Sequence, residues 1–378
     1  MIYLDHNAAS PLRPEAKRAM AAACELAGNP SSVHRAGREA RAVLENARAD
    51  VAALVGGSPA EVIFTAGGTE ADALVLWGAV LADSSIKRLI ISAVEHDAVR
   101  ANAALVAEKH GITLQILPVT RDGVADLGAL RGLLSTGGRA LVALMTANNE
   151  TGAIQPVSEA ARMVHDAGGL IFSDAVAAVG KVALPSVDYL TIGGHKIGGP
   201  MGTGAVVLGK DVPFAPLLRG GGQEASRRAG SENLVALAGF GAAAHLAATE
   251  RANVANITVR DDFEQALHAA CSEVVIFSET VPRLWNTCLF AVPGMAAENA
   301  LMALDLDGIC LSRGAACSSG KVKTSHVLTA MGVPEDLARC VLRISFGWNS
   351  RTADGEAALA GLSSFWQRVR ALPGRAAA

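Results

Sequence analysis

Two kinds of hydrophobic pattern alternate along the chain from about residue 60 to residue 208. Longer stretches with helical spacing of their apolar positions lie at 71–81, 97–110 and 157–167. Short runs rich in apolar and β-branched residues predict strands at 61–64, 88–92, 113–117, 140–145, 170–173, 189–192 and 204–208. This alternation predicts an α/β layer with a mainly parallel sheet, whose ligands bind beyond the carboxyl ends of the strands.

The pattern changes after a glycine-rich loop at 219–222. A long helical region runs to about residue 270, and short strands and helices follow at 274–277, 288–291, 297–306, 325–331 and 341–345. At 378 residues the chain exceeds the size at which one hydrophobic core usually stops growing. We therefore expect an N-terminal arm at 1–13, a large domain at 14–250 and a smaller α+β domain at 251–378.

Composition narrows the class of function. The chain is 51% hydrophobic with a net charge of −3, and its charges form no basic stripe for nucleic acid or for an anionic membrane. No apolar run reaches the length of a membrane span, the start lacks the pattern of a signal peptide, and the six cysteines show no metal-type pairing. We expect a cytoplasmic protein that acts on a small molecule, without a metal, nucleic acid or a membrane.

The most informative polar residues follow two neighbouring predicted strands. Asp174 ends the strand at 170–173, and His195 and Lys196 follow the strand at 189–192. A lysine amine can form a Schiff base with the aldehyde of pyridoxal phosphate (PLP), and an aspartate can keep the pyridine nitrogen of that cofactor protonated. The pair therefore predicts a PLP site.

Three other strand ends carry groups that suit such a site. Gly68 and Thr69 open a helix after a strand, where amides and a hydroxyl can hold a phosphate, although a plain turn has the same pattern. His96 can stack on the pyridine ring and exchange protons, or it can cap the next helix. Asn149 can bond the phenolic oxygen of the cofactor, or it can belong to a turn.

The C-terminal region adds two candidates. Cys317 lies in a Gly/Ser-rich loop between Arg313 and Lys321, where an accessible thiolate of lowered pKa can act as a nucleophile. Arg343 lies in an apolar strand, so its charge must be paired, either with a substrate carboxylate or in a structural salt bridge. The remaining cysteines are expected to be buried and inert: Cys24, Cys271, Cys288, Cys310 and Cys340.

Taken together, these residues resemble the cysteine desulfurases of the class V aminotransferase group, which have PLP fold type I. The resemblance is close to full length and includes the segments 3–5, 28–34, 68–70, 95–96, 148–150, 195–196, 221–224 and 228–233, the Cys317 loop and Arg343. It implies a large domain with a mainly parallel seven-stranded sheet and a smaller α+β domain. It also implies a homodimer.

The resemblance assigns a role to each candidate. PLP would be held by Gly68, Thr69, His96, Asn149, Asp174, His195, Lys196 and Ser231 of the partner subunit. Lys196 would also act as acid and base, Arg343 and Asn149 would bind L-cysteine, and Cys317 would attack the substrate sulfur. The products would be L-alanine and a persulfide on Cys317, passed to an acceptor protein for iron–sulfur clusters or thiolated nucleotides.

Two positions depart from the family pattern. Ala177 stands where a glutamine is usual, and Gly193 stands where a serine is usual. Each change removes a hydrogen bond to the cofactor, so we expect weaker retention of PLP. Two alternatives stay open on the sequence: a related PLP lyase or aminotransferase, such as selenocysteine lyase, and a catalytically weak scaffold of a sulfur-transfer complex.

Overall fold

The largest sheet of the molecule is an α/β sheet of seven strands in the order β2-β8-β7-β6-β5-β3-β4. A computed structural model describes residues 1–251, 258–314 and 324–370 of the chain. Its strands are β2 (Val62–Thr65), β3 (Ile86–Ser92), β4 (Thr113–Leu117), β5 (Arg139–Ala143), β6 (Leu170–Asp174), β7 (Tyr189–Gly193) and β8 (Gly204–Leu208). Strand β8 is antiparallel to both neighbours, and the other adjacent pairs are parallel. The expected fold class is confirmed.

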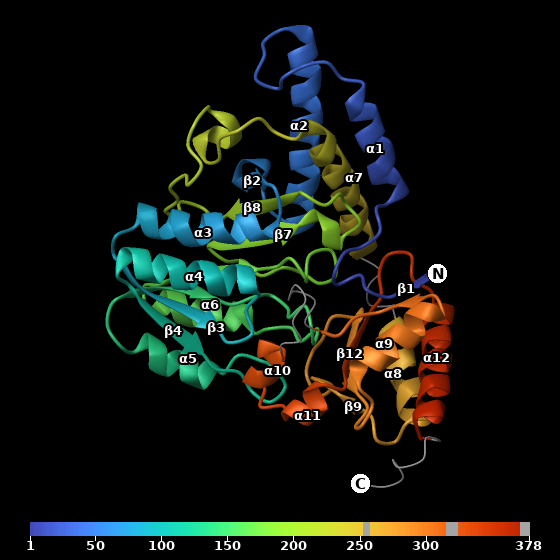
Figure 1. Cartoon of the computed structure of the whole chain (residues 1–378). Helices are drawn as coiled ribbons and strands as arrows, with labels where there is room; N and C mark the ends of the chain where they lie inside the picture. The colour runs from blue at the N-terminus through green and yellow to red at the C-terminus, as the bar shows by residue number, and fades with distance from the viewer. Residues whose placement is uncertain (252–257, 315–323, 371–378) are drawn as a thin grey trace.

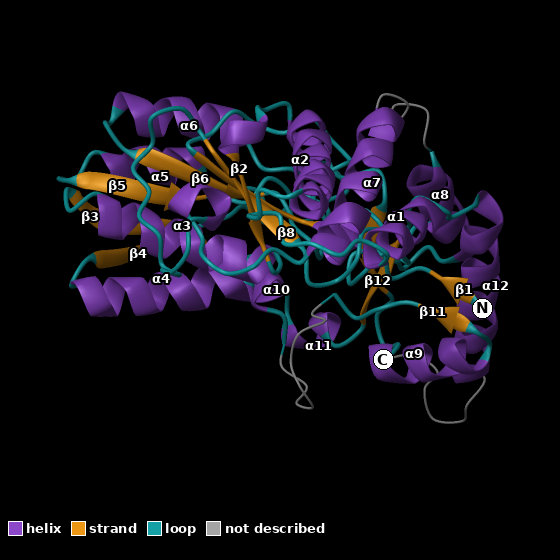
Figure 2. Ribbon diagram, turned by 90° about the horizontal axis from the view of Figure 1, so that it is seen from above, coloured by secondary structure: helices purple, strands orange, loops and turns teal. Residues whose placement is uncertain are grey.

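Helices cover both faces of this sheet (Figure 2). Leu89 and Ile91 of β3 pack in one core cluster with α3 (Gly68–Ala82) and α4 (Asp97–His110). Ile90, between them, packs in another cluster with α5 (Leu127–Leu134) and α6 (Val157–Asp166). Because successive side chains of a strand point to opposite faces, the uninterrupted apolar run of β3 serves two helical layers.

Three further helices pack beside the β2 and β8 edge of the sheet (Figure 1). They are α1 (Pro14–Cys24), α2 (Arg35–Val55) and α7 (Leu234–Arg251). Helix α2 buries Leu44, Ala47, Val51 and Leu54, which recur every three or four residues and so share one face. This face and α7 meet in a common core cluster with β2 and β8.

A smaller antiparallel sheet stands apart from the large one and has the order β12-β10-β9 (Figure 1). It consists of β9 (Val275–Ile276), β10 (Thr287–Ala291) and β12 (Val341–Ser345). Its surrounding helices are α8 (Val259–Ala270), α9 (Ala297–Leu306), α10 (His326–Ala330), α11 (Glu335–Ala338) and α12 (Thr352–Arg370). Near the N-terminus, β1 (Ile2–Tyr3) pairs with β11 (Ile309–Cys310). The domain boundaries at residues 13 and 250 stay a prediction.

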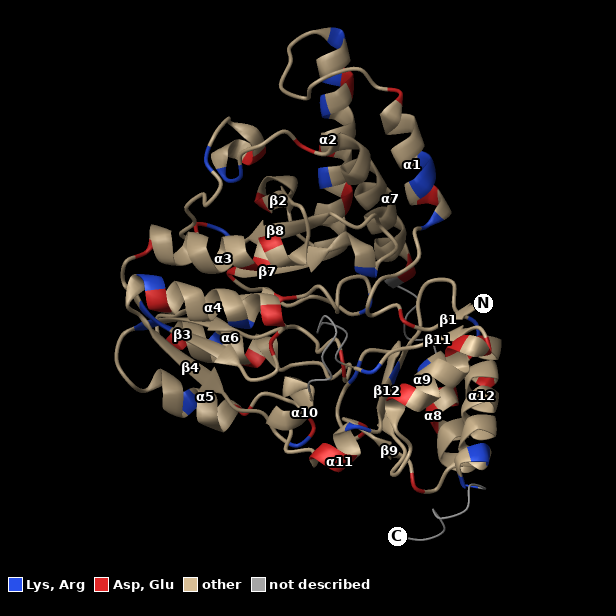
Figure 3. Cartoon of the chain, viewed as in Figure 1, with Lys and Arg blue, Asp and Glu red and all other residues tan. Residues whose placement is uncertain are grey.

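The surface charges are mixed, and Figure 3 shows acidic and basic residues interspersed along most elements. Within the described ranges, no helix is long and apolar enough to cross a membrane.

The prediction that five cysteines are buried was partly wrong. Cys271, Cys288 and Cys340 are buried, but Cys310 is half-buried and Cys24 is exposed, because α1 ends at Cys24 and buries Ala16 and Ala23 instead.

Candidate functional site

Strands β6 and β7 bring Asp174 and Lys196 to the same edge of the large sheet. Asp174 ends β6 opposite Thr191 of β7, and Lys196 ends the short 3₁₀ turn (Gly194–Lys196) that follows β7. The amine of half-buried Lys196 donates to the backbone carbonyls of Asn7 and Ala8. The N-terminal segment therefore crosses the sheet edge directly at this lysine.

The Asp174 carboxylate is buried, and Oδ1 accepts a 2.8 Å hydrogen bond from the Val176 amide. Burial raises the pKa of Asp174, while positive charge on His96 and on Lys196 lowers it. A cationic group placed against this carboxylate would add to the opposing effect. A protonated pyridine nitrogen is such a group.

Two further buried carboxyls lie close enough to Asp174 to interact with it electrostatically. Asp72 of α3 accepts a 2.6 Å hydrogen bond from the Thr191 hydroxyl, and burial and then the Asp174 charge raise its pKa well above the usual range. Burial raises the pKa of Glu95 to about 8. Neither role was predicted from the sequence, although a charged residue such as Asp72 inside the apolar stretch at 71–81 indicates that it must be partnered.

His96 caps α4, because its Nδ1 accepts a 3.1 Å hydrogen bond from the Ala98 amide. The capping alternative is therefore observed. It uses one ring nitrogen only, so it does not oppose a second role for the ring face. His326, which was not predicted as a site residue, lies nearby, with its Nε2 2.9 Å from the Glu95 carbonyl.

Helix α3 starts at Gly68 directly after β2. A Cβ at Gly68 would lie 2.7 Å from Cγ2 of Val176, so the backbone approaches the β6 end closely only because a glycine stands there. The first amides of this 15-residue helix have no partner in the preceding turn of the helix and can bind an anion. Thr69 is exposed beside them.

These residues fit PLP. A primary amine, a buried carboxylate and the start of a helix match the aldehyde, the pyridine nitrogen and the phosphate of the cofactor. Burial and the Lys196 charge lower the pKa of His195 to about 4. Its imidazole is therefore neutral at pH 7 and can accept one hydrogen bond and donate another. A Cβ at Gly193 would lie 3.1 Å from that ring.

Arg343 of β12 is completely buried and lies beside the Asn149 backbone. Its Nη2 donates to Asp5 at 2.7 Å, and its Nη1 donates to the carbonyls of Asn149 at 3.0 Å and Gly314 at 3.1 Å. Its Nε has no hydrogen-bond partner within the described part of the chain. The structural salt bridge is therefore present, and one donor remains for a ligand.

The preceding asparagine forms the turn. Oδ1 of Asn148 accepts hydrogen bonds from the amides of Glu150 and Thr151. This arrangement fixes the Asn149 backbone beside Arg343. Of the remaining candidates, Ser231 is exposed, and Cys317 lies outside the described residues, as does Lys321. Arg313 pairs with Glu298 at 2.7 Å.

Comparison with known proteins identifies the family. The sequence model of class-V aminotransferases matches residues 2–357. A cysteine desulfurase from Cereibacter sphaeroides is 41% identical over 98% of this chain and 97% of the relative. The chain belongs to the cysteine desulfurases of the class-V aminotransferase family. Among solved structures, a NifS-like protein from Rickettsia africae is 32% identical with a TM-score of 0.86, covering 97% of this chain and 99% of that one.

PLP dependence is a property of this family.

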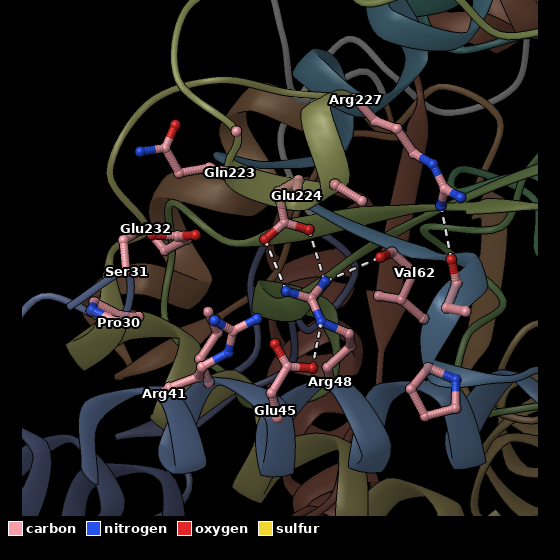
Figure 4. A pocket seen from close by; sticks show the side chains of 15 residues that line it. Pro30, Ser31, Arg41, Glu45, Arg48, Val62, Gln223, Glu224, Arg227 and Glu232 are labelled. Atoms are coloured by element: carbon pink, nitrogen blue, oxygen red, sulfur yellow. Dashed lines mark hydrogen bonds and ion pairs between the residues drawn. The ribbon is translucent and has the colours of Figure 1, made fainter. Parts of the chain in front are cut away.

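Three of the family segments, 28–34, 221–224 and 228–233, meet around a pocket of about 440 Å³ that Ser31, Glu224 and Glu232 help to line (Figure 4). Arg48 on its floor forms a bidentate ion pair with Glu224, at 2.7 and 2.9 Å, and Glu224 also accepts from the Phe64 amide. These bonds hold the left-handed backbone at Glu224, whose φ is 47°.

A smaller cavity of about 40 Å³ lies against Lys196 and is also lined by Lys181 and Trp285. Lys181 is buried and donates to the Ala177 carbonyl at 2.8 Å. Burial, and then the charge on Lys196, lower the pKa of Lys181 to about 7. This desulfurase-family chain therefore has a second lysine close to half-buried Lys196, and this second lysine, which was not predicted from the sequence, is buried.

Proposed function

We propose that this protein removes sulfur from L-cysteine with PLP as cofactor and leaves a persulfide on Cys317. The observation that carries the proposal is the buried guanidinium of Arg343, whose Nε has no hydrogen-bond partner within the described part of the chain. Its Nη1 donates to the Asn149 carbonyl, which also accepts from the side chain of Asn7. The Asn7 carbonyl in turn accepts from Lys196, so the arginine lies close to the cofactor lysine. A substrate with an α-carboxylate satisfies the Nε donor, and a guanidinium is the group best shaped to hold it. Bound PLP would supply an electron sink for the carbon skeleton of the substrate.

The chain's own residues divide the remaining work. Lys196 would hold the cofactor and then move a proton at its Nζ, which the carbonyls of Asn7 and Ala8 orient. With PLP bound, Asp174 would keep the pyridine nitrogen protonated, and His96 would stack on the ring.

The other cofactor contacts lie around the ring substituents and the phosphate. Asn149 would bond the phenolic oxygen and bind the substrate beside Arg343. The phosphate would be held by Gly68, Thr69, His195 and Ser231 of the partner subunit, so the functional unit would be a homodimer.

The sulfur transfer balances without an external oxidant. The Cys317 thiolate attacks the substrate sulfur, the carbon–sulfur bond breaks, and the carbon keeps the electron pair and takes up a proton. The products are L-alanine and a persulfide on Cys317. We propose that this persulfide passes, in the cytoplasm, to an acceptor protein for iron–sulfur cluster assembly or thio-nucleotide synthesis.

A weakly active scaffold is the second candidate, and the observation that favours it is the pair of departures at Ala177 and Gly193. A Cβ at Gly193 would lie 3.1 Å from the His195 ring and 3.2 Å from the Val176 side chain. The surroundings of this position therefore leave little room for a residue larger than glycine. The unpartnered Nε of Arg343 and the buried carboxylate of Asp174, however, favour a protein that binds substrate and cofactor, because each would gain a partner from such a ligand.

The test is an assay of alanine and sulfide with L-cysteine, PLP and a reductant, run on the purified protein and on Cys317→Ala. We expect stoichiometric alanine from the protein and none above background from the variant. Alanine that survives in the variant would indicate a lyase without a protein nucleophile, and selenocysteine should then be compared as substrate. No alanine from either protein would support the scaffold.

A further inference from the structure

Lys181 is a buried lysine that forms no ion pair within residues 1–251, 258–314 and 324–370. Its Nζ donates a 2.8 Å hydrogen bond to the Ala177 carbonyl, which uses one of the three protons of an ammonium. Its backbone is also fixed, since the Lys181 amide donates to the Ala178 carbonyl at 2.9 Å in the turn that follows β6. Because a buried ammonium without a counter-charge is costly, this group either loses its proton or takes up an anion.

The cavity of about 40 Å³ that Lys181 lines has room for such an anion. A cavity needs roughly 10–15 Å³ to hold one water molecule, so this one can hold two or three waters or one small anion. Trp285 lines the same cavity, and its indole Nε1 is buried without a hydrogen-bond partner in the described part of the chain. An indole N–H and an ammonium can only donate, so both groups need an acceptor.

The charged groups around the cavity favour an anion as its occupant. Lys196 lines it together with Lys181, and the positive charge on Lys196 disfavours that on Lys181. Arg13 and Glu250, also in the wall, offset each other in a bidentate ion pair at 2.7 and 2.6 Å. Asp174 interacts with Lys196, but no carboxylate of the described residues offsets the charge on Lys181. The wall therefore has a net positive charge.

Two buried or half-buried histidines close to Lys181 leave this balance unchanged. Burial, and then the Lys181 charge, lower the pKa of His6 to about 4, while Asp354 has a smaller opposite effect. Burial, and then the charges on Lys196 and Lys181, lower the pKa of His195 to about 4. Both imidazoles are therefore neutral at pH 7, and neither supplies a counter-charge for the lysine.

We propose that this cavity binds a small monovalent anion of the size of chloride, held by the Lys181 ammonium and the Trp285 indole N–H. The anion supplies the counter-charge that the described chain does not place at Lys181. It allows the lysine to keep its proton beside Lys196 at a smaller cost of burial. The inference is independent of the proposed function, because it concerns the folded protein whether or not alanine is formed.

Bromide is the direct probe, because it resembles chloride and has an anomalous X-ray signal. Crystals of the protein at pH 6.0 are soaked in potassium bromide, with PLP in excess so that the halide does not enter the cofactor site. We expect an anomalous peak in the cavity, within hydrogen-bonding distance of Lys181 Nζ and Trp285 Nε1. Peaks at the protein surface alone, which would be adventitious ions only, or a cavity that holds only water would overturn the inference.

Thermal midpoints in potassium chloride and in potassium gluconate, at equal ionic strength and with PLP in excess, measure the same binding in solution. Because a ligand that binds only the folded state stabilises it, chloride should raise the midpoint by at least about 2 °C over gluconate at pH 6.0. At pH 9.5 the difference should disappear, since the pKa of Lys181 is about 7 and its amine is neutral there. No difference at pH 6.0 would contradict the inference.

Two variants connect this shift to the cavity. Lys181→Met removes the charge and should abolish the chloride-dependent shift at pH 6.0, and Trp285→Phe removes the indole N–H and should at least halve it. The matched controls are Lys17→Met, at an exposed lysine of α1, and Trp77→Phe, in α3 and outside the cavity. Both should keep the shift. A full shift in Lys181→Met, or an equal loss in the controls, would overturn the inference. If neither cavity variant folds, the bromide map of the unchanged protein decides.

Discussion

The guanidinium of Arg343 and the carboxylate of Asp5 lie 2.7 Å apart, Nη2 to Oδ1, and they join β12 to the N-terminal segment. The arginine side chain is 1% exposed and the aspartate side chain 21% exposed. Because both are withdrawn from water, each depends on the other to offset the cost of burying its charge. The pair, with the bond from Nη1 to the Asn149 carbonyl, also fixes the orientation of the Arg343 guanidinium.

Asp5→Ala should lower the free energy of unfolding by about 3 kcal/mol, because it leaves a buried guanidinium without its counter-charge. Asp5→Asn keeps an oxygen acceptor for Nη2 and should cost less. Equilibrium denaturation in urea measures both. Glu39→Ala is the control, since its ion pair with Arg35 is exposed and should contribute well under 1 kcal/mol. Equal losses of unfolding free energy in Asp5→Ala and in the control would show that the buried pair stabilises the protein no more than an exposed pair does.

Restoring the family residues should strengthen cofactor binding. If Ala177→Gln and Gly193→Ser each add one hydrogen bond to PLP, each contributes on the order of 1 kcal/mol, and the double variant should bind PLP roughly thirtyfold more tightly. Ala177→Gln should give the larger share, because a Cβ at Gly193 lies 3.1 Å from the His195 ring and 3.2 Å from Val176, which must both shift. Titrating PLP into apo protein measures the dissociation constant. An unchanged constant in the double variant would contradict the prediction.

Local patterns predicted the large sheet well. The expected strands at 113–117 and 204–208 coincide with β4 and β8, and the others differ from the structure by one or two residues at an end. A continuous apolar run bounded by turn residues is a local signal, and it is enough to locate a strand that is buried on both faces. The helices α1, α2 and α5 were not singled out, because α1 and α2 lie outside the alternating region and α5 is short.

The electrostatic surroundings of the site could not be predicted in the same way. Arg343 and Asp5 are 338 residues apart in sequence, and the Thr191–Asp72 hydrogen bond spans 119 residues. Such pairs depend on how the elements pack, which periodicity does not encode. Strand ends indicated Asp174 and Lys196 because parallel strands share an edge. The charged groups around that edge come from other parts of the chain: Asp72 from α3, Glu95 from the segment before α4, and Asp5 from the N-terminal segment.

Glu95 should make stability fall as the pH rises. Its pKa is about 8 in the folded protein against the ordinary value of 4.5, so between these values the folded state holds a proton that the unfolded state has lost. The destabilisation is therefore absent below about pH 4.5 and complete above about pH 8. Glu95→Gln removes it and keeps an oxygen acceptor for the Met145 amide, which lies 2.7 Å from Oε1.

The gain in thermal midpoint from Glu95→Gln should consequently be larger at pH 8.5 than at pH 5.0. Scanning calorimetry of both proteins at the two pH values provides the comparison. The exposed Glu159 of α6, changed to glutamine, is the control and should show no such difference. A pH-independent effect of Glu95→Gln would mean that Glu95 is ionised throughout the range.

Lys181 should act in the opposite direction. Its pKa is lowered to about 7 in the folded protein from the ordinary value of 10.5, so between these values the unfolded state holds the additional proton. Stability contributed by this group therefore rises with pH from about 7 to about 10.5, and the cost of a buried ammonium is complete below pH 7. His6 and His195, together with Lys196, share this region, and Lys181 lowers the pKa of both histidines.

Lys181→Met should therefore raise the thermal midpoint at pH 6.0 by more than it does at pH 9.5, because the methionine has no charge to bury. The exposed Lys17 of α1, changed to methionine, is the control for a lost positive charge. Its effect should be small at both pH values. A Lys181→Met protein that is equally destabilised at pH 6.0 and pH 9.5 would show that the ammonium is needed for packing, through its bond to the Ala177 carbonyl, and that its charge is tolerated.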